Sequence, residues 1–288
     1  MAHSACVISI PPPPISLFLR CVRLAVSQNA AYVPPHGTPN SFMYIRPLLF
    51  GSSPQISLVP PDEYTLCVYV TPAQSYHGSQ PLDAVILEEF DRAAPRGTGA
   101  AKVGGNYAPV MRWSDRARSE GYHLTLHLDS KTHTEIDEFS TSAFLGIKTQ
   151  AGEQPVLVVP DSAAIIASVT SQSCQVLAEA FGWKVEKRAI KLDELSSFSE
   201  VIAAGTAATL VPVRSITSKS TEQKFSFNCS DLAPGPMCMM LLDAIQKIQQ
   251  GDAVDFFNWC DPVEGRKPAA LPVKSVLTGL EKHVKISV

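Results

Sequence analysis

A single lysine, Lys102, stands in the run "GTGAAKVGGNY", where every near neighbour is small. A primary amine can bond covalently to an aldehyde and can then carry a proton to and from the bound molecule. Gly104 and Gly105 leave space for a flat ring against the backbone. Taken alone, the run is more typical of a surface lysine in a flexible loop, but its residue types also allow a lysine that reacts with a planar aldehyde.

The segments that must position this lysine mix helices and strands. Apolar periodicity and Gly or Pro punctuation predict strands over 41–51, 64–71, 122–129 and 184–190, helices over 108–121, 168–183 and 239–251, a hairpin over 144–160, a short acidic helix near 193–200 and a turn over 203–208. In the strand over 122–129, leucines alternate with polar residues, which predicts one buried and one exposed face. Many short strands between few helices favour a mixed α/β (α+β) fold with a mixed sheet.

Four domain segments are expected. Residues 1–20 are predicted to be unstructured, because Pro11 to Pro14 remove backbone donors and favour extended geometry. Residues 21–75 form a partial small domain and 76–263 a large one, with the boundary in the turn-rich linker 72–81. Residues 264–288 are a C-terminal extension to which the sequence assigns no role.

Composition excludes several classes of function. The chain has 288 residues, a formal charge of −3 and no block of like charges, so neither nucleic acid nor an anionic membrane is expected as a partner. No apolar run is long enough to span a bilayer. Seven scattered cysteines without a CxxC pair argue against disulfides and structural zinc. These features favour the cytoplasm, while the lack of Asp or Glu before Asp62 keeps mitochondria as an alternative.

No metal is expected. His123 and His127 are the nearest pair of histidines in the predicted strand over 122–129. Residues four apart on a strand lie about 13 Å from each other, at roughly 3.3 Å per residue, so the two imidazoles cannot share one ion.

Several segments, in order, resemble the branched-chain amino acid aminotransferases, class IV pyridoxal-phosphate enzymes of fold type IV. They are "MYIRPLLFGSSPQISLVPP", "GTGAAKVGGNYAP", "DEFSTSAFLGI", "AGTAATLVPV" and "FFNWCDPV", which are similar to the family's Tyr-x-Arg-Pro, lysine, Glu-x-x-Thr, Gly-Thr-Ala and closing segments. The resemblance runs from about Cys21 to Val263. It implies that Lys102 is the Schiff-base partner of pyridoxal 5′-phosphate (PLP) and that the large domain is a mixed-sheet pseudo-barrel.

The resemblance also implies ligands for the ring and the phosphate. Glu138 matches the carboxylate that keeps the pyridine nitrogen protonated, and Thr141 would support the ring. A phosphate is commonly held by amides at a helix start and by hydroxyls, which points to the amides of Val169 and Thr170 and to the Thr206 hydroxyl. Capping of the helix over 168–183 explains Thr170 equally well.

Tyr107 contacts the cofactor by the same resemblance, and Tyr44, Arg46 and Ala207 line the substrate side. A packed structural arginine remains the alternative for Arg46. The chain departs from the family where "SVTSQ" lacks the usual Gly and Arg, and where "AATLV" replaces a CxxC. It is also expected to be shortened at the N-terminus, so that the small domain lacks its first strands.

The expected reaction moves an amino group between a branched-chain L-amino acid and 2-oxoglutarate, in a homodimer that uses PLP. Two alternatives stay open. One is a D-amino acid transaminase or PLP-dependent lyase of the same fold. The other is a shortened homologue with weak or no catalysis that serves by binding a partner subunit.

Overall fold

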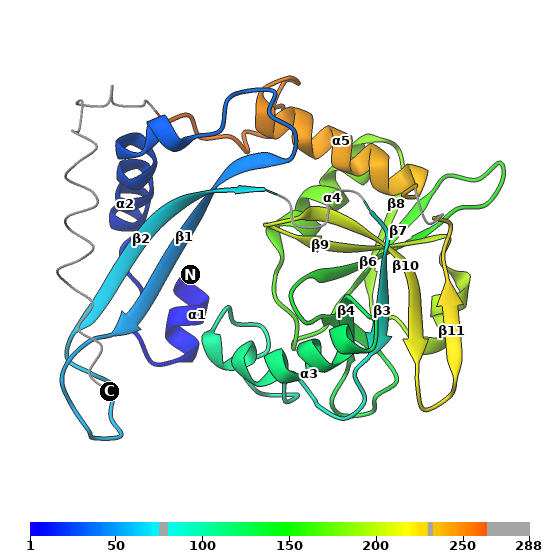
Figure 1. The fold of residues 1–288 in the computed structure, drawn as a ribbon, viewed down its shortest axis with the longest axis horizontal. Coiled ribbons are helices and arrows are strands. Elements are labelled where there is room, and N and C mark those ends of the chain that lie inside the picture. Colours follow the sequence, from blue (N-terminus) through cyan, green and yellow to red (C-terminus); the bar gives the residue numbers. More distant parts are fainter. Residues whose placement is uncertain (75–79, 230–232, 264–288) are drawn as a thin grey trace. The chain divides into compact units, whose positions relative to one another are not determined.

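The chain folds into two compact units, which are described separately below (Figure 1). The computed structural model describes residues 1–74, 80–229 and 233–263. The larger unit takes residues 1–12, 53–62 and 75–260, and the smaller unit takes 13–52, 63–74 and 261–288.

The larger unit is built on a nine-stranded sheet in the order β5-β4-β3-β10-β9-β6-β7-β8, with β11 paired to β10. Its strands are β3 (Leu82–Ile86), β4 (Leu124–Leu128), β5 (Ile136–Phe139), β6 (Ala143–Lys148), β7 (Val156–Pro160), β8 (Lys184–Arg188), β9 (Glu200–Gly205), β10 (Thr209–Ser218) and β11 (Gln223–Ser226). The pairs β3–β4, β3–β10 and β7–β8 are parallel and the other pairs are antiparallel. The sheet is therefore mixed, as predicted.

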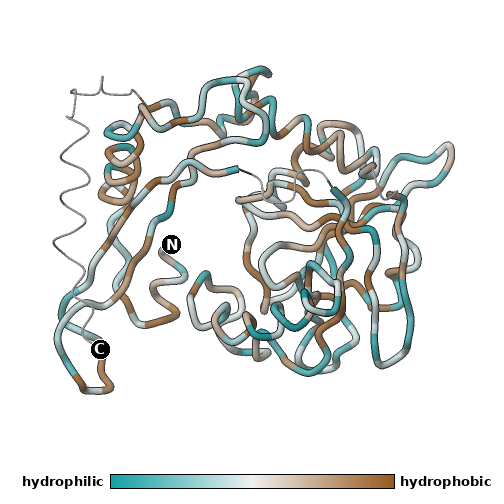
Figure 2. The backbone as a smooth tube through the Cα atoms, in the orientation of Figure 1, coloured by the Kyte–Doolittle hydropathy of each residue, from teal (hydrophilic) through white to brown (hydrophobic). Residues whose placement is uncertain are grey.

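The central strands of this sheet are buried on both faces. On β6, Phe144 belongs to one apolar cluster and Leu145 to the other, because successive side chains of a strand point to opposite faces. The second cluster packs under α4 (Val169–Ala180) and α5 (Pro236–Gln250). Figure 2 shows the hydrophobic colouring gathered along these strands. Two covered faces explain why the strands are short apolar runs.

Strand β4 differs from the prediction in its burial. Leu126 faces the first cluster, as expected from the alternation, but Thr125 and His127 on the other face are each only 2% exposed. Helix α3 (Ala108–Ser119) packs against this strand. The prediction of one exposed face is wrong, because Thr125 and His127 both hydrogen-bond to the hydroxyl of Ser140 rather than to solvent.

Helix α5 begins under a carboxylate from β9. The Glu200 side chain accepts hydrogen bonds from the amides of Met237 at 3.0 Å and Cys238 at 2.9 Å. A Cβ on Gly235 would lie 2.1 Å from this carboxylate, so the residue before the helix has no room for a side chain. Glu200, which is distant in sequence, therefore supplies the acceptor for the first amides of α5 that an N-cap residue usually supplies.

We expect Glu200→Ala to lower the free energy of unfolding by about 1–3 kcal/mol, since it leaves two helix-start amides without an acceptor. Urea unfolding monitored by circular dichroism measures this. Glu200→Gln keeps one acceptor oxygen and should lose less, and exposed Glu222→Ala is the control. Equal stability of Glu200→Ala and Glu222→Ala would contradict the capping role.

The smaller unit holds β1 (Ser41–Gly51) and β2 (Tyr64–Gln74), an antiparallel pair in which Ser41 faces Gln74 and Gly51 faces Tyr64. Helix α2 (Ile15–Gln28) packs against both strands, and the short helix η1 (Ala30–Tyr32) follows it. Both predicted strands are confirmed, the second with three more residues than expected.

The prediction that residues 1–20 lack structure is wrong. Helix α1 (Ala2–Val7) lies in the larger unit, with Ala5 buried, and α2 begins at Ile15. The prolines fill the link between these helices, and Pro14 directly precedes the first helical residue of α2. Prolines that interrupt a chain are tolerated at a helix start, where their missing amide hydrogen is not needed.

Other predicted elements are present with small shifts. The hairpin is β6 and β7, the three helices are α3, α4 and α5, and the acidic helix is the 3₁₀ turn η3 (Leu192–Ser197). The patterns did not predict β3, β5, β9, β10 or β11, and only the turn between β9 and β10 was expected. Residues 75–79 of the proposed linker and the extension 264–288 lie outside the described residues. Among the helices that the structure describes, none is long and apolar enough to cross a membrane.

Candidate active site

The loop that carries Lys102 is held by its own asparagine. Buried Asn106, in the short helix η2 (Gly104–Asn106), donates from Nδ2 to the carbonyls of Thr98 at 2.7 Å and Ala101 at 2.9 Å. Its Oδ1 accepts from the Thr98 hydroxyl at 2.8 Å. The backbone amide of Lys102 donates to Ser4 Oγ on α1 at 2.8 Å. The loop backbone is thus fixed on both sides of the lysine, although no regular strand or helix contains it.

The lysine side chain points to its own signature tyrosine. Lys102 Nζ donates to Tyr107 Oη at 2.5 Å and lies 4.6 Å from the centre of the ring. A cavity of about 200 Å³ opens beside it. Six residues predicted for the site line this cavity, namely Lys102, Tyr107, Glu138, Thr141, Val169 and Thr206.

Four predicted residues are not part of that lining. Thr170 lies one residue further into α4, and Ala207 lies in the turn between β9 and β10. Tyr44 and Arg46 are on β1 of the smaller unit, where the Arg46 guanidinium lies 4.9 Å from the centre of the Tyr44 ring. Their roles toward cofactor or substrate stay predictions.

Glu138 is a buried carboxylate that lines the cavity. It lies on β5, and its side chain is 6% exposed. Burial raises the pKa of Glu138 to about 7, against the opposing charges of Arg92 and Lys102. One of its oxygens, Oε1, lies 2.7 Å from Nη2 of Arg92. Near neutral pH, the charge state of Glu138 therefore depends on the charged residues around it.

The helix start beside the cavity offers amides and hydroxyls. Ser168 caps α4, with its Oγ accepting from the Ser171 amide at 3.2 Å. The first amides of a helix have no intrahelical partner, and Ser168 and Val169 line the cavity. Thr206, after β9, lines it as well. An adjoining cavity of about 160 Å³ shares Glu138 and Ser168.

These groups fit PLP in kind. The amine of Lys102 suits an aldehyde, buried Glu138 suits a ring nitrogen, and the helix start with Thr206 suits a phosphate. The fit rests on the donors and acceptors that line one cavity.

Sequence reasoning missed two residues that hold the site together. Asn106 was not predicted as a site residue, although its position directly after two glycines in the lysine segment could have indicated it. Arg92 is 8% exposed and contacts three separate segments. It lies in an irregular loop, where no periodicity distinguishes a buried arginine from an exposed one.

The lysine loop is pressed against the segment that leads into α4. A Cβ added to Gly99 would lie 2.3 Å from the carbonyl oxygen of Ala164 and 2.5 Å from the Cβ of Ala93. Real Cβ atoms do not approach a backbone oxygen so closely, so one of the two segments would have to move.

We expect Gly99→Ala to lower the free energy of unfolding by about 1–3 kcal/mol and to weaken PLP binding, because overpacking displaces backbone at the cavity wall. Thermal melts with and without PLP measure both effects. Gly104→Ala is the matched control for stability, since a Cβ there meets nothing within 4 Å. If the two variants melt alike without PLP, the close packing of Gly99 has no consequence.

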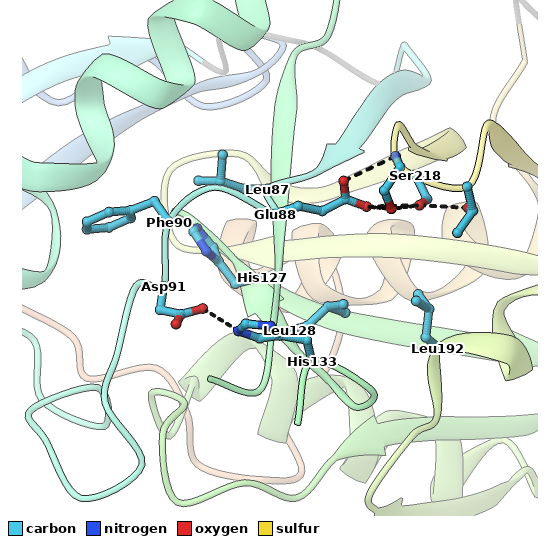
Figure 3. Close-up of a pocket in the computed structure, with 11 residues that line it drawn as sticks. Leu87, Glu88, Phe90, Asp91, His127, Leu128, His133, Leu192 and Ser218 are labelled. Carbon is cyan, nitrogen blue, oxygen red and sulfur yellow. Dashed lines mark hydrogen bonds and ion pairs between the residues drawn. The ribbon is translucent and has the colours of Figure 1, made fainter. Parts of the chain in front are cut away.

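A second cavity, of about 330 Å³, is lined by His127 but not by Lys102 (Figure 3). Burial lowers the pKa of His127 to about 3, so its imidazole is neutral, and its Nε2 contacts Ser140 Oγ at 2.7 Å. Nearby, His133 and Asp91 pair at 2.9 Å. Within the described ranges, no group of three or more His, Cys, Asp or Glu side chains could hold a metal ion.

Comparison with known proteins places this geometry in a family. A family model for the class IV aminotransferases matches residues 1–216. The match therefore includes the first twenty residues, and the prediction that the resemblance begins near Cys21 is wrong. The first twenty residues match the family model although they contain none of the five motifs given above.

Named relatives are aminotransferases of fungi. The aminotransferase poxL of Penicillium oxalicum is 54% identical over 263 residues, which cover 91% of this chain and 72% of that protein. The aminotransferase TOXF of Cochliobolus carbonum is 52% identical over 266 residues, covering 91% and 73%.

Among solved structures, the branched-chain amino acid aminotransferase of Escherichia coli matches with a TM-score of 0.72 and 25% identity, over 91% of this chain and 80% of that one. The branched-chain enzyme of Thermobaculum terrenum, solved in its PLP form, has a TM-score of 0.74. The mixed sheet thus curls into the half-barrel of fold type IV. This chain belongs to the class IV aminotransferases, and its cofactor is PLP.

Proposed function

We propose that this aminotransferase moves the amino group between a branched-chain aliphatic L-amino acid and 2-oxoglutarate. The observation that carries the proposal is the single cavity lined by Lys102, Glu138, Val169 and Thr206. The likeness to the E. coli branched-chain enzyme supports the substrate class. Relatives of higher identity are named only as aminotransferases, so the proposal concerns the reaction and not a pathway.

Each residue has a stated task in this proposal. PLP, when bound, supplies the electron sink that makes the α-proton of an amino acid removable. Lys102 Nζ attaches the cofactor and then carries that proton, and Tyr107, already bonded to Nζ, orients the amine. Glu138 holds the protonated ring nitrogen.

The remaining tasks concern the phosphate and the substrate. The amides of Val169 and Thr170 and the hydroxyl of Thr206 hold the phosphate, and Thr141 supports the ring. Tyr44, Arg46 and Ala207 face the substrate, with Arg46 near the carboxylate.

The test uses the purified chain with PLP and follows the visible absorbance of the bound cofactor. L-Leucine should remove the absorbance band of the amine-linked form within seconds to minutes. Adding 2-oxoglutarate should restore the band and release one glutamate for each cofactor restored. Coupled measurement of 2-oxoacid from L-leucine, L-isoleucine, L-valine, L-phenylalanine and D-leucine ranks the substrates.

Three outcomes would overturn parts of the proposal. Faster turnover of D-leucine than of L-leucine would favour a D-amino acid transaminase. A stable band with every amino acid would favour a binding protein. Preference for an aromatic or polar amino acid would retain the transaminase and reject the branched-chain substrate.

We also propose a homodimer in the cytoplasm, with mitochondria as the alternative. Within the described part of the chain, no cysteine forms a disulfide, which suits a reducing compartment. Light scattering of the PLP-loaded protein measures its mass, and a mass of one chain of 31.1 kDa at micromolar concentration would reject the dimer.

A further inference from the structure

We propose that Arg92 is a positioning residue of the cofactor site, which joins the Lys102 loop and the segment before α4 to the carboxylate of Glu138. The inference rests on the proposed role of Glu138 toward the ring of PLP. It adds a residue that does not line the cavity and acts only through the groups that do.

The contacts of Arg92 come from three places in the chain. Its Nη2 lies 2.7 Å from Oε1 of Glu138 on β5 and donates to the Ala164 carbonyl at 2.5 Å. Both Nη1 and Nη2 approach the Gly99 carbonyl, at 3.4 Å and 3.3 Å. Gly99 lies just before Lys102, and Ala164 lies just before the cap of α4. One guanidinium thus contacts the loop that carries Lys102, the carboxylate of Glu138 and the segment that leads into α4.

Stability alone does not explain this arrangement. The Arg92 side chain is 3% exposed and that of Glu138 is 6% exposed. The free energy of desolvating two buried charges is about as large as their mutual attraction. Well-packed apolar residues of similar volume commonly give the same stability. A planar fork with several fixed donors is, however, the group that can hold a carboxylate and two carbonyls in one geometry.

The charge of Arg92 has a chemical consequence for Glu138. Burial raises the pKa of Glu138 to about 7, Arg92 and Lys102 oppose that rise, and Asp137 adds to it. His127 also lies near Arg92 but is neutral, because burial lowers its pKa to about 3. Without Arg92, the pKa of Glu138 would be higher still, so a larger fraction of Glu138 would be protonated at neutral pH. A carboxylic acid cannot supply the negative charge that stabilises a protonated pyridine.

The experiment measures Glu138 directly in the protein without PLP. Its carboxyl carbon is followed by ¹³C NMR as pH changes, with the Glu138→Gln variant to assign the signal. The variants are Arg92→Met, Arg92→Lys and, as matched control, Arg96→Met, which changes an exposed arginine of the same loop. PLP affinity is then measured by fluorescence titration.

We expect the titration midpoint of Glu138 in Arg92→Met to lie at least about 1 pH unit above that of the wild type, as the loss of an adjacent opposite charge predicts. PLP affinity should fall at least about tenfold. Arg92→Lys should restore most of the midpoint but not the affinity, since an ammonium cannot bond to all three acceptors. Arg96→Met should match the wild type in both.

An unchanged midpoint together with wild-type PLP affinity in Arg92→Met would overturn the inference. If Arg92→Met does not fold, the double variant Arg92→Met with Glu138→Gln decides. Folding of the double variant alone shows that the two groups act as a pair, and failure of both shows a role in folding that does not pass through Glu138, which also overturns the inference. If the wild-type protein does not turn over L-leucine but Arg92→Met still raises the titration midpoint of Glu138, the proposed function is rejected and this inference stands.

Discussion

Replacing Lys102 with alanine is expected to abolish covalent attachment of PLP and to slow amino-group transfer by at least about 10²–10⁴-fold, the range that general acid–base catalysis alone contributes. Among the residues that the structure describes, no other lysine lines the cavity. The Tyr107 hydroxyl, which accepts from Lys102 Nζ, cannot replace an amine. Borohydride reduction followed by peptide mass spectrometry shows which lysine carries the cofactor.

Two further variants make this result specific. Lys131→Ala removes an exposed lysine and should leave labelling and turnover unchanged. Lys102→Arg keeps the positive charge, yet a guanidinium stays protonated and should be as inactive as alanine. Recovery of the reduced PLP adduct on a different lysine, in the wild-type protein, would contradict the assignment of Lys102.

Phe144→Ala is expected to lower the free energy of unfolding by about 3–5 kcal/mol, the usual cost of removing a buried aromatic ring. Phe144 is 1% exposed, and its ring centre lies 5.8 Å from that of Phe139 and 5.9 Å from that of Phe198. Phe139 follows Glu138 on β5, and Ala143 before Phe144 lines the cavity. A void here should therefore also loosen the cofactor site.

Chemical unfolding of the protein without PLP measures this loss. Phe144→Leu keeps most of the apolar volume and should lose less. Val176→Ala on α4 is the control, because Val176 is 37% exposed. A loss below about 1 kcal/mol in Phe144→Ala would show that the cluster collapses around the gap.

Local patterns predicted about half of the elements, because caps, apolar spacing and turn residues that lie close together in the chain specify those elements. The helix α4 follows from its serines, its apolar spacing and Gly182, and the hairpin of β6 and β7 follows from two apolar runs around a turn. Strands β3 and β5 were missed because each is short, and β3 pairs with β10, which lies far away in the chain. The burial of Thr125 was missed as well, because it depends on α3 and Ser140.

What the sequence by itself determined is the family motif set and, within it, Lys102 as the reactive amine. These are properties of residue type and spacing along the chain. Only the tertiary structure decided that Arg92 meets Glu138 and that Gly99 lies against Ala164. The charge of a buried carboxylate and the space beside a glycine depend on atoms brought together by folding, and no single stretch of sequence contains them.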